Sequence, residues 1–278
     1  MSGRVVPLAH TRIAAAQAEA PDVLLLHGLG SCGEDWGLQI PALRSDYSLL
    51  LPDLRGQGRT PMPPGWPTIA DLAADVRALL DTLGLPSVHV VGLSLGGAVG
   101  LQLAAEDPGR VRSLTAVNTF ARLRAERGAA RRGLERTWLA ATGRMDELGR
   151  RVADGLFPDG GQEAFRAAAA ARLAHNRPMN YLRLLLAVGR FDLRARLGAI
   201  QAPTLIVAGD QDTTVSMACK LELAEGIRGA QLQVFAGSRH VTPLDRSEDF
   251  NARLLAFLAE AERKAAVTHI APGAGGRT

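Results

Sequence analysis

A serine lies between glycines where an apolar run meets a helical pattern, in the segment Gly92-Leu93-Ser94-Leu95-Gly96-Gly97. The apolar run predicts a strand at residues 88–93, and the pattern after the serine predicts a helix at residues 95–106. A tight turn between such elements strains the backbone, and the glycines remove β-carbons that would collide there. Ser94 is therefore a candidate nucleophile at the positive end of a helix.

Two backbone amides are candidates for binding an oxyanion beside Ser94. The Leu95 amide opens the predicted helix and can point at a developing negative charge. The turn His27-Gly28-Leu29-Gly30 follows another apolar run and can bring the Leu29 amide to the same place. The alternative is that these glycines only make a tight turn between a strand and a helix.

A serine hydroxyl needs a general base within hydrogen-bond reach. His240 is the best placed of the six histidines, because it follows a strand predicted at residues 231–235 and precedes the last helix. For a lone loop histidine the alternative is a solvated side chain. The other histidines lie in the glycine turn, in a predicted strand, in the Ala- and Arg-rich segment or near the termini: His27, His89, His175, His10 and His269.

The acid that orients such a base is expected at the end of a strand between the serine and the histidine. The segment Gly209-Asp210-Gln211-Asp212 follows a strand predicted at residues 204–208. Residues 118–119, after the strand predicted at 111–117, offer no carboxylate. We therefore predict Asp212 as the acid, with Asp210 as the alternative.

Strand and helix patterns alternate along both halves of the chain, which predicts a parallel sheet covered by helices. Strands are expected at residues 23–26, 48–51, 88–93, 111–117, 204–208 and 231–235, and the apolar runs of the first two are typical of buried strands. Helices are expected at residues 34–43, 68–83, 95–106, about 217–227 and about 248–264. Functional side chains are then expected at the carboxyl ends of the strands.

The alternation stops between residues 120 and 194, which are rich in Ala and Arg and predict a helical cap over the site. The core domain is expected to comprise residues 1–119 and 195–265, and the tail 266–278, rich in Pro, Gly and Ala, to be disordered. Trp138 is a candidate substrate contact, and both Trp138 and Phe157 can belong either to the core of the cap or to a pocket wall.

Arginines of the cap can bind a substrate carboxylate if one of them faces inward. A solvated helix face is the more frequent role for any single arginine. The candidates are Arg122, Arg124, Arg127, Arg131 and Arg132.

The composition favours one globular domain with an insertion, because 278 residues with 47% apolar and 22% charged side chains can bury a large core. No segment has the length of a membrane span or the pattern of a signal peptide, so we expect a cytoplasmic protein with no membrane partner. Cys32 and Cys219 lack paired spacing, which argues against disulfides and zinc. Aromatic residues are 4%, too few for a basic stripe interleaved with aromatics, so we expect no nucleic acid partner.

From about residue 23 to residue 258 the chain resembles the α/β-hydrolase family. The motifs occur in the family's order: the 27–30 turn with Trp36, Asp53-Leu54-Arg55-Gly56-Gln57-Gly58-Arg59-Thr60, the Ser94 turn, and the Asp212 and His240 loops. The resemblance implies a mostly parallel sheet flanked by helices, with a cap inserted after the strand that follows the nucleophile helix. It also implies a triad of Ser94, Asp212 and His240, an oxyanion hole of the Leu29 and Leu95 amides, and neither metal nor cofactor.

Within the family, residues 191–194, 200–204 and 249–251 look similar to the 3-oxoadipate enol-lactonase branch. Gln57 departs from the family's usual histidine, and Arg239 places a bulky charge before His240. Dehalogenases and epoxide hydrolases of similar sequence use an aspartate nucleophile, against which Ser94 argues. We expect hydrolysis of a small ester or lactone; the alternatives are thioester or carbon–carbon bond cleavage, and a non-catalytic homologue that only binds a ligand.

Overall fold

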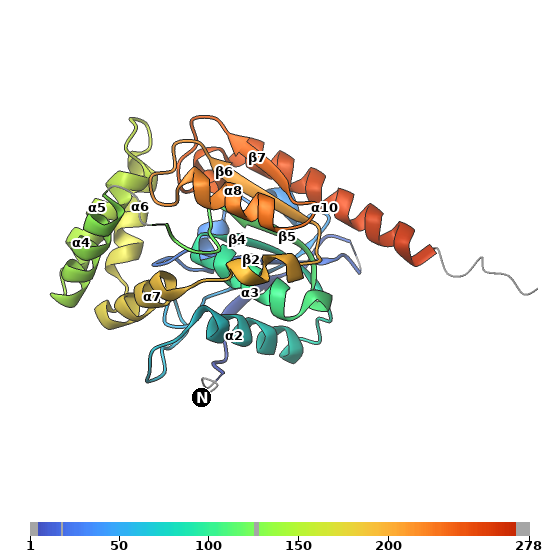
Figure 1. Ribbon diagram of the computed structural model, residues 1–278, viewed down its shortest axis with the longest axis horizontal. Helices are drawn as coiled ribbons and strands as arrows, with labels where there is room; N and C mark the ends of the chain where they lie inside the picture. The colour runs from blue at the N-terminus through green and yellow to red at the C-terminus, as the bar shows by residue number, and fades with distance from the viewer. Residues whose placement is uncertain (1–4, 18, 125–127, 271–278) are drawn as a thin grey trace, which may run out of the picture.

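The computed structural model describes residues 5–17, 19–124 and 128–270, in which a seven-stranded sheet lies between layers of helices (Figure 1). The strands lie in the order β1-β3-β2-β4-β5-β6-β7, and every pairing except that of β1 with β3 is parallel. Their bounds are β1 His10–Ile13, β2 Asp22–Leu26, β3 Ser48–Pro52, β4 Val88–Leu93, β5 Val111–Val117, β6 Thr204–Gly209 and β7 Gln231–Phe235.

The six strands expected from apolar runs are all confirmed, each within a residue at either end. The sequence analysis gives no strand before residue 23, and β1 is therefore an addition. It is a four-residue edge strand with polar His10, Thr11 and Arg12, so it lacks the apolar run that marks the buried strands. The expected mostly parallel sheet is confirmed, with β1 as its one antiparallel member among the described residues.

Alternate residues of the buried strands face two separate cores, as the period of a strand requires. Leu24 and Leu26 of β2 pack in a cluster with residues of α2, α3 and α8. Val23 and Leu25 pack on the opposite face, with residues of α1 and α10. Because both faces are covered, these strands contain near-continuous apolar runs, and that made them easy to predict.

The helices of the core are confirmed with two differences. The single helix expected at residues 34–43 is two short pieces, and the last helix continues past Lys264 to Ile270, so residues 266–270 of the expected tail are helical. The remainder of that tail, 271–278, lies outside the described residues. The bounds are η1 Gly33–Trp36, α1 Ile40–Leu43, α2 Ile69–Thr82, α3 Leu95–Glu106, η2 Pro108–Arg110, η3 Arg194–Ala199, α8 Met217–Gly226, α9 Thr242–Asp245 and α10 Ser247–Ile270.

Between β5 and β6 the chain leaves the sheet and forms helices that we call the cap helices. They lie to one side of the strands, at the left of Figure 1. Their bounds are α4 Ala129–Ala141, α5 Met145–Leu156, α6 Glu163–Ala174 and α7 Pro178–Arg190. Leu148, Leu173 and Tyr181 form a small apolar cluster of their own, against which Leu29 of the core packs. The Leu29 turn is therefore held between the core and the cap.

The start of α3 lies so close to β2 that it needs a glycine. A β-carbon on Gly96 would lie 2.1 Å from the Leu26 carbonyl oxygen, and one on Gly92 would lie 2.4 Å from the Gly96 oxygen. Both contacts are with backbone, which cannot swing aside as a flexible side chain can. The two glycines thus allow the strand and the helix to meet at Ser94, as expected from the sequence.

We expect Gly96→Ala to lower the free energy of unfolding by about 2 kcal/mol or more, because its methyl group overlaps backbone. Gly155→Ala in α5 is the matched control, since a β-carbon there meets nothing within 4 Å. It should be neutral or stabilising by up to about 1 kcal/mol, since alanine favours a helix. Urea denaturation measures both. Equal stability of Gly96→Ala and the native chain would contradict the packing described here.

Candidate active site

Ser94 occupies a strained backbone position between β4 and α3. Its φ of 53° and ψ of −110° are unusual for any residue with a β-carbon. The Ser94 amide donates to the Val117 carbonyl at 2.9 Å, and its carbonyl accepts the Thr119 hydroxyl at 2.7 Å. Such a conformation costs about 1–3 kcal/mol and persists only where the surroundings impose it. The end of β5 therefore holds Ser94 in place.

The glycine turn after β2 lies against Ser94. A β-carbon on Gly28 would be 3.8 Å from the Ser94 β-carbon. Within the part of the chain that the structure describes, neither the Leu29 nor the Leu95 amide donates to a protein acceptor. The Leu95 amide is at the first position of α3, where a helix has no acceptor for it. Both amides expected to bind an oxyanion are thus free donors near Ser94.

His27 holds the turn and is not available as a base. Its Nε2 accepts the Leu54 amide at 2.9 Å, and its Nδ1 lies 2.8 Å from the Gly28 carbonyl. Nδ1 therefore carries the proton of a neutral ring. Burial lowers the pKa of His27 and so favours this neutral form.

The loops after β6 and β7 bring a carboxylate and an imidazole together. His240 Nδ1 lies 2.9 Å from Asp212 Oδ2, and the Asp212 side chain is 0% exposed. Oδ1 of Asp212 accepts the amides of Thr214 and Val215 at 2.8 and 3.1 Å. Asp210 is exposed instead, so Asp212 is the carboxylate bonded to the ring.

The Asp212 carboxyl is ionised. Burial raises its pKa, but the charges and hydrogen bonds of His240, and then of Lys220, outweigh burial and leave this pKa well below its usual range. An ionised carboxylate only accepts, so the shared proton lies on His240 Nδ1. In the neutral ring this leaves the lone pair on Nε2, and that tautomer is the one that a general base requires.

Asn118 ties the histidine loop to the strand beside Ser94. Its Nδ2 donates to the carbonyl oxygens of His240 and Arg239 at 2.9 and 3.1 Å and to the Thr242 hydroxyl at 2.8 Å. Its Oδ1 accepts the Gly209 amide at 2.8 Å. Asn118 is 0% exposed and has a positive φ of 44°. One amide side chain therefore joins the ends of β5, β6 and β7.

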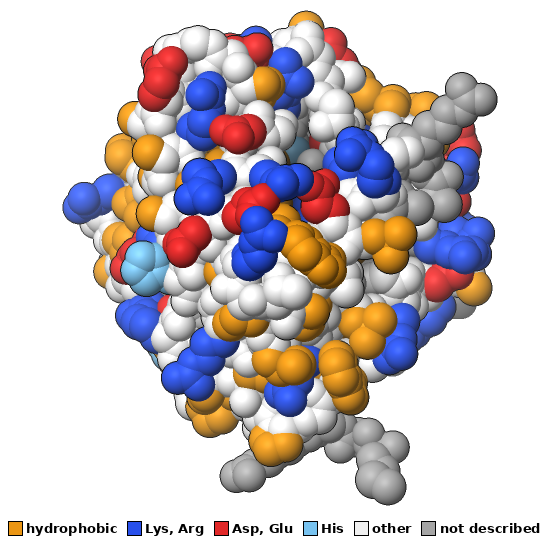
Figure 2. Space-filling view, turned by 90° about the vertical axis from the view of Figure 1, so that its left-hand side faces the viewer, with side chains coloured by type: hydrophobic (Ala, Val, Ile, Leu, Met, Phe, Trp, Pro, Cys, Tyr) orange, Lys and Arg blue, Asp and Glu red, His pale blue; other side chains and the backbone are white. Residues whose placement is uncertain are grey.

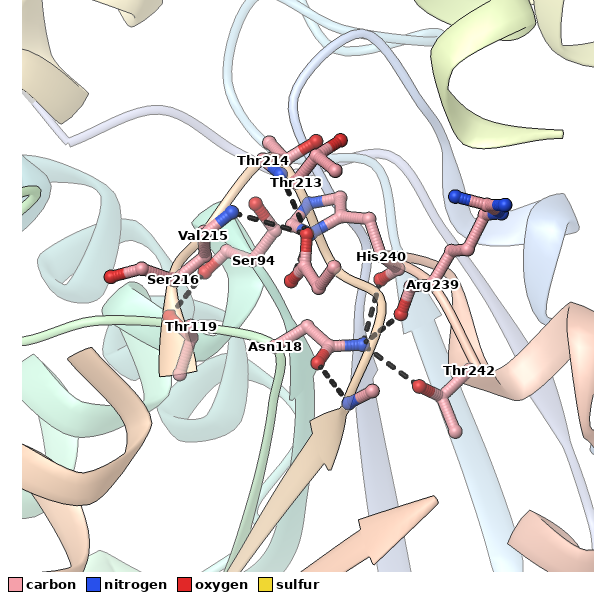
Figure 3. A network of polar contacts seen from close by, with 12 residues as sticks. Ser94, Asn118, Thr119, Thr213, Thr214, Val215, Ser216, Arg239, His240 and Thr242 are labelled. Atoms are coloured by element: carbon pink, nitrogen blue, oxygen red, sulfur yellow. Dashed lines mark hydrogen bonds and ion pairs between the residues drawn. The ribbon is translucent and has the colours of Figure 1, made fainter. Parts of the chain in front are cut away.

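The serine and the imidazole lie at the same edge of the sheet. The Ser94 amide donates to the Val117 carbonyl. The next residue, Asn118, donates to the His240 carbonyl, and Figure 3 draws this contact. No hydrogen bond joins the Ser94 hydroxyl to the ring among the described residues. Catalytic hydrogen bonds are often long before substrate binds. The structure joins His240 to Asp212 and places Ser94 at the end of a neighbouring strand.

The motif around Gln57 supports the glycine turn. Gln57 Oε1 accepts the Gly30 amide, and Asp53 Oδ1 accepts the Gly33 amide at 2.9 Å. Asp53 Oδ2 also accepts the Arg59 amide at 3.0 Å. The glutamine that departs from the family's usual histidine therefore has a structural contact.

A half-open cavity of about 570 Å³ lies between this loop and residues 172–180 of the cap, and its lining does not include Ser94, Asp212 or His240.

The cap arginines are mostly paired at the surface. Arg122 and Arg124 are each more than half exposed and pair with Asp192 and Glu222. Arg132 donates to the Thr213 carbonyl at 2.9 Å, beside the acid loop. Figure 2 shows blue and red side chains interspersed over the face on which the cap helices lie. Arg131 is exposed, and Arg127 lies outside the described residues.

The two aromatic residues expected in the cap differ in their surroundings. Phe157 is buried and stacks on Phe165 with ring centroids 5.8 Å apart, so it belongs to the core of the cap. Trp138 is 52% exposed and lies under the Arg144 guanidinium, 4.8 Å from the ring centroid. This placement gives no support to the predicted substrate contact of Trp138.

Three residues of the site were not predicted. Asn118 and Thr119 carry no carboxylate, and Lys220, whose Nζ lies 2.8 Å from Asp212 Oδ2, is not among the expected site residues. Their position directly after a buried strand could have singled out the first two. Nothing in the spacing of Lys220 predicts its contact.

The described residues contain no cluster of three His, Cys, Asp or Glu side chains able to hold a metal ion, and no described helix could span a membrane.

Comparison with known proteins bears on the fold. The sequence model of a family described as having the alpha/beta hydrolase fold matches residues 21–247. A protein of Variovorax paradoxus (strain S110), named as a carbamate hydrolase, RutD, is 35% identical over 259 residues, which cover 87% of this chain and 93% of that protein.

Two solved structures have the same fold. A hydrolase from Pseudomonas aeruginosa PA01 is 33% identical with a TM-score of 0.83, and the match covers 90% of this chain and 94% of that one. The enol-lactonase from Burkholderia xenovorans LB400 is 28% identical with a TM-score of 0.84, and covers 91% and 96%.

We expect Asn118→Asp to displace the histidine loop, because an ionised carboxylate cannot donate to the His240 and Arg239 carbonyls. The variant should lose about 2–4 kcal/mol of unfolding free energy, measured in urea. The NMR signal of the proton on His240 Nδ1 should broaden through exchange with water. Thr115→Val is the control on the same strand, since its buried hydroxyl has no hydrogen-bond partner in the part of the chain that the structure describes, and it should lose no stability. A sharp signal of the His240 Nδ1 proton in Asn118→Asp would contradict the role of Asn118 in holding the histidine loop.

Proposed function

The chain belongs to the α/β-hydrolase family, and on that premise we propose that it is a serine hydrolase that cleaves a carboxylic ester or lactone through an acyl-enzyme. The observation that carries this proposal is the buried hydrogen bond between His240 and ionised Asp212, at the edge of the sheet where strained Ser94 lies. A buried carboxylate that fixes the tautomer of an imidazole is the arrangement that activates a serine.

In the first half of the proposed reaction, His240 Nε2 takes the proton of the Ser94 hydroxyl while its oxygen attacks the substrate carbonyl carbon. The carbonyl oxygen becomes an oxyanion and accepts hydrogen bonds from the Leu29 and Leu95 amides. The carbon–oxygen bond to the alcohol then breaks, and the imidazolium returns its proton to the leaving oxygen. In a lactone the leaving alcohol stays attached to the acyl group.

In the second half, a water molecule takes the place of the alcohol. His240 removes a proton from this water as its oxygen attacks the acyl carbon, and the same two amides hold the second oxyanion. The bond to Ser94 breaks, Ser94 regains its proton from His240, and a carboxylic acid leaves. Asp212 stays ionised throughout and stabilises the imidazolium. Loss of one oxyanion donor costs about 3 kcal/mol in comparable enzymes.

The enol-lactonase from Burkholderia xenovorans LB400 favours a lactone as substrate, in line with the branch that residues 191–194 resemble. The name of the Variovorax paradoxus relative favours a second candidate, a carbamate. A carbamate presents the same acyl carbonyl to Ser94, with nitrogen on one side. Comparing kcat/KM for p-nitrophenyl acetate, a γ-lactone and p-nitrophenyl N-methylcarbamate ranks these candidates. Thioester and carbon–carbon bond substrates belong in the same panel, because they need the same triad.

The proposed partner is a small molecule, and the proposed location is cytoplasmic, which suits the unpaired thiols of Cys32 and Cys219. Burial, with Asp35 nearby, raises the pKa of the Cys32 thiol to about 11. At pH 8 only about one Cys32 in a thousand is a thiolate, so this cysteine is a poor nucleophile. Ser94 remains the candidate nucleophile.

We expect Ser94→Ala to lower hydrolysis of p-nitrophenyl acetate at least about 10³-fold in a protein that still folds, because it removes the attacking oxygen. Ser87→Ala is the matched control, since Ser87 precedes β4 at the opposite edge of the sheet, and its rate should equal that of the native chain. An unchanged rate in folded Ser94→Ala would refute the mechanism.

A fluorophosphonate separates this enzyme from a non-catalytic homologue. The reagent should label the native chain and the Ser87→Ala variant on Ser94, as located by mass spectrometry, and should leave Ser94→Ala unlabelled, because only an activated serine reacts. A folded native chain that resists the reagent would favour ligand binding without catalysis.

A further inference from the structure

A buried lysine lies against the proposed triad acid. Lys220 is on α8, its side chain is 0% exposed, and Lys220 and Lys264 are the only lysines of the chain. Its Nζ donates to Asp212 Oδ2 at 2.8 Å and to the Val215 carbonyl at 2.7 Å. Because a buried ammonium is costly unless it is paired, this contact holds the carboxylate firmly.

Lys220 and His240 bond the same oxygen. His240 Nδ1 lies 2.9 Å from Asp212 Oδ2, the atom that also accepts Lys220 Nζ. The other oxygen is occupied by the Thr214 and Val215 amides. The carboxylate therefore accepts four hydrogen bonds and cannot rotate without losing several of them. Lys220 fixes the position of the oxygen that orients the imidazole.

The charges of the three groups set the protonation of the ring. Ionised Asp212 and protonated Lys220 cancel, so a neutral imidazole completes an uncharged set. Protonating His240 places a second cation beside the same oxygen, and like charges at such short range disfavour each other. Lys220 thus favours the neutral ring over the imidazolium.

Other charged groups around the set are already paired or directed elsewhere. Arg239, next to His240, pairs with Asp159 of the cap at 3.3 Å. Asp245 accepts the Arg239 amide and the Ser238 hydroxyl. Arg132 faces the Thr213 carbonyl, and on α8 Glu222 pairs with Arg124. Lys220 is therefore the cation in direct contact with Asp212 among the described side chains.

We propose that Lys220 is a positioning residue of the hydrolytic relay, which holds Asp212 and keeps His240 unprotonated in the general-base form. This inference rests on the proposed function. The proposed contact keeps His240 unprotonated at a lower pH than a pair of aspartate and histidine without the lysine would allow. The consequence for catalysis is a weaker base that stays available in acidic solution.

Substitution of the lysine tests the charge. In Lys220→Met and Lys220→Gln, the acidic limb of the kcat/KM profile for p-nitrophenyl acetate should move to higher pH by about one unit or more. The midpoint of the His240 ring signals in an NMR titration should move to higher pH by the same amount. Lys264→Met is the matched control, because Lys264 is 62% exposed and pairs with Glu260. It should leave the acidic limb and the His240 midpoint unchanged. If folded Lys220→Met has the same titration midpoints as the native chain, the proposal is overturned.

A measurement on the native chain covers the case in which the variants do not fold. With two lysines, each ¹⁵Nζ signal is assigned by the Lys264→Met control. By linkage, the Lys220 signal must shift with the same midpoint as the His240 ring, while the Lys264 signal stays constant. A Lys220 signal that does not respond to the His240 titration would overturn the proposal. Neither NMR measurement needs turnover, so an inactive enzyme with coupled signals would refute the proposed function and leave the role of Lys220 intact.

Discussion

A hydrogen bond between two buried side chains, His240 and Asp212, determines what this site can do. An imidazole in water rotates and exists in either tautomer, and neither state is ready to accept a proton from a particular hydroxyl. An ionised carboxylate that already accepts two backbone amides removes both freedoms, since it requires the proton on Nδ1. The neighbouring residues of the site bury this pair and hold it in position through hydrogen bonds. The function therefore depends on how the fold keeps a negative charge buried.

The fold does so by joining strand ends. Parallel strands place the loops after β5, β6 and β7 at one edge, and Asn118 connects all three through its side chain. The Ser94 amide donates to the carbonyl of Val117, the residue before Asn118. The hydroxyl of Thr119, the residue after Asn118, donates to the Ser94 carbonyl. The strain at Ser94 is thus opposed by the same strand that positions the histidine loop. Displacing any one of these loops would disturb both the proposed nucleophile and the proposed base.

Much of this arrangement could be predicted from the sequence, for physical reasons. Strands buried on both faces must be apolar throughout, so β2 to β6 stand out, whereas β7 is an edge strand with Leu232 and Val234 exposed. Ser94, Asp212 and His240 each follow a predicted strand, which is why chemistry could be predicted there. The edge strand β1 has no apolar run, and residues 266–270 adjoin a Pro-, Gly- and Ala-rich tail. Contacts made by single side chains across long separations, such as Asn118 to His240 or Lys220 to Asp212, leave no periodic pattern. The same limit applies to Trp138, whose exposure depends on how the cap packs.

In the proposed mechanism the Ser94 oxygen attacks the carbonyl carbon, the Leu29 and Leu95 amides bind the carbonyl oxygen, and His240 accepts the Ser94 proton. A crystal structure of the chain treated with a phosphonate inhibitor would locate all of these groups around one phosphorus. We expect continuous density from Ser94 Oγ to phosphorus, with one phosphonyl oxygen within hydrogen-bond distance of both the Leu29 and Leu95 amides and the His240 ring beside the Ser94 oxygen. Phosphorus bound to another residue, or a phosphonyl oxygen turned away from both amides, would contradict this mechanism.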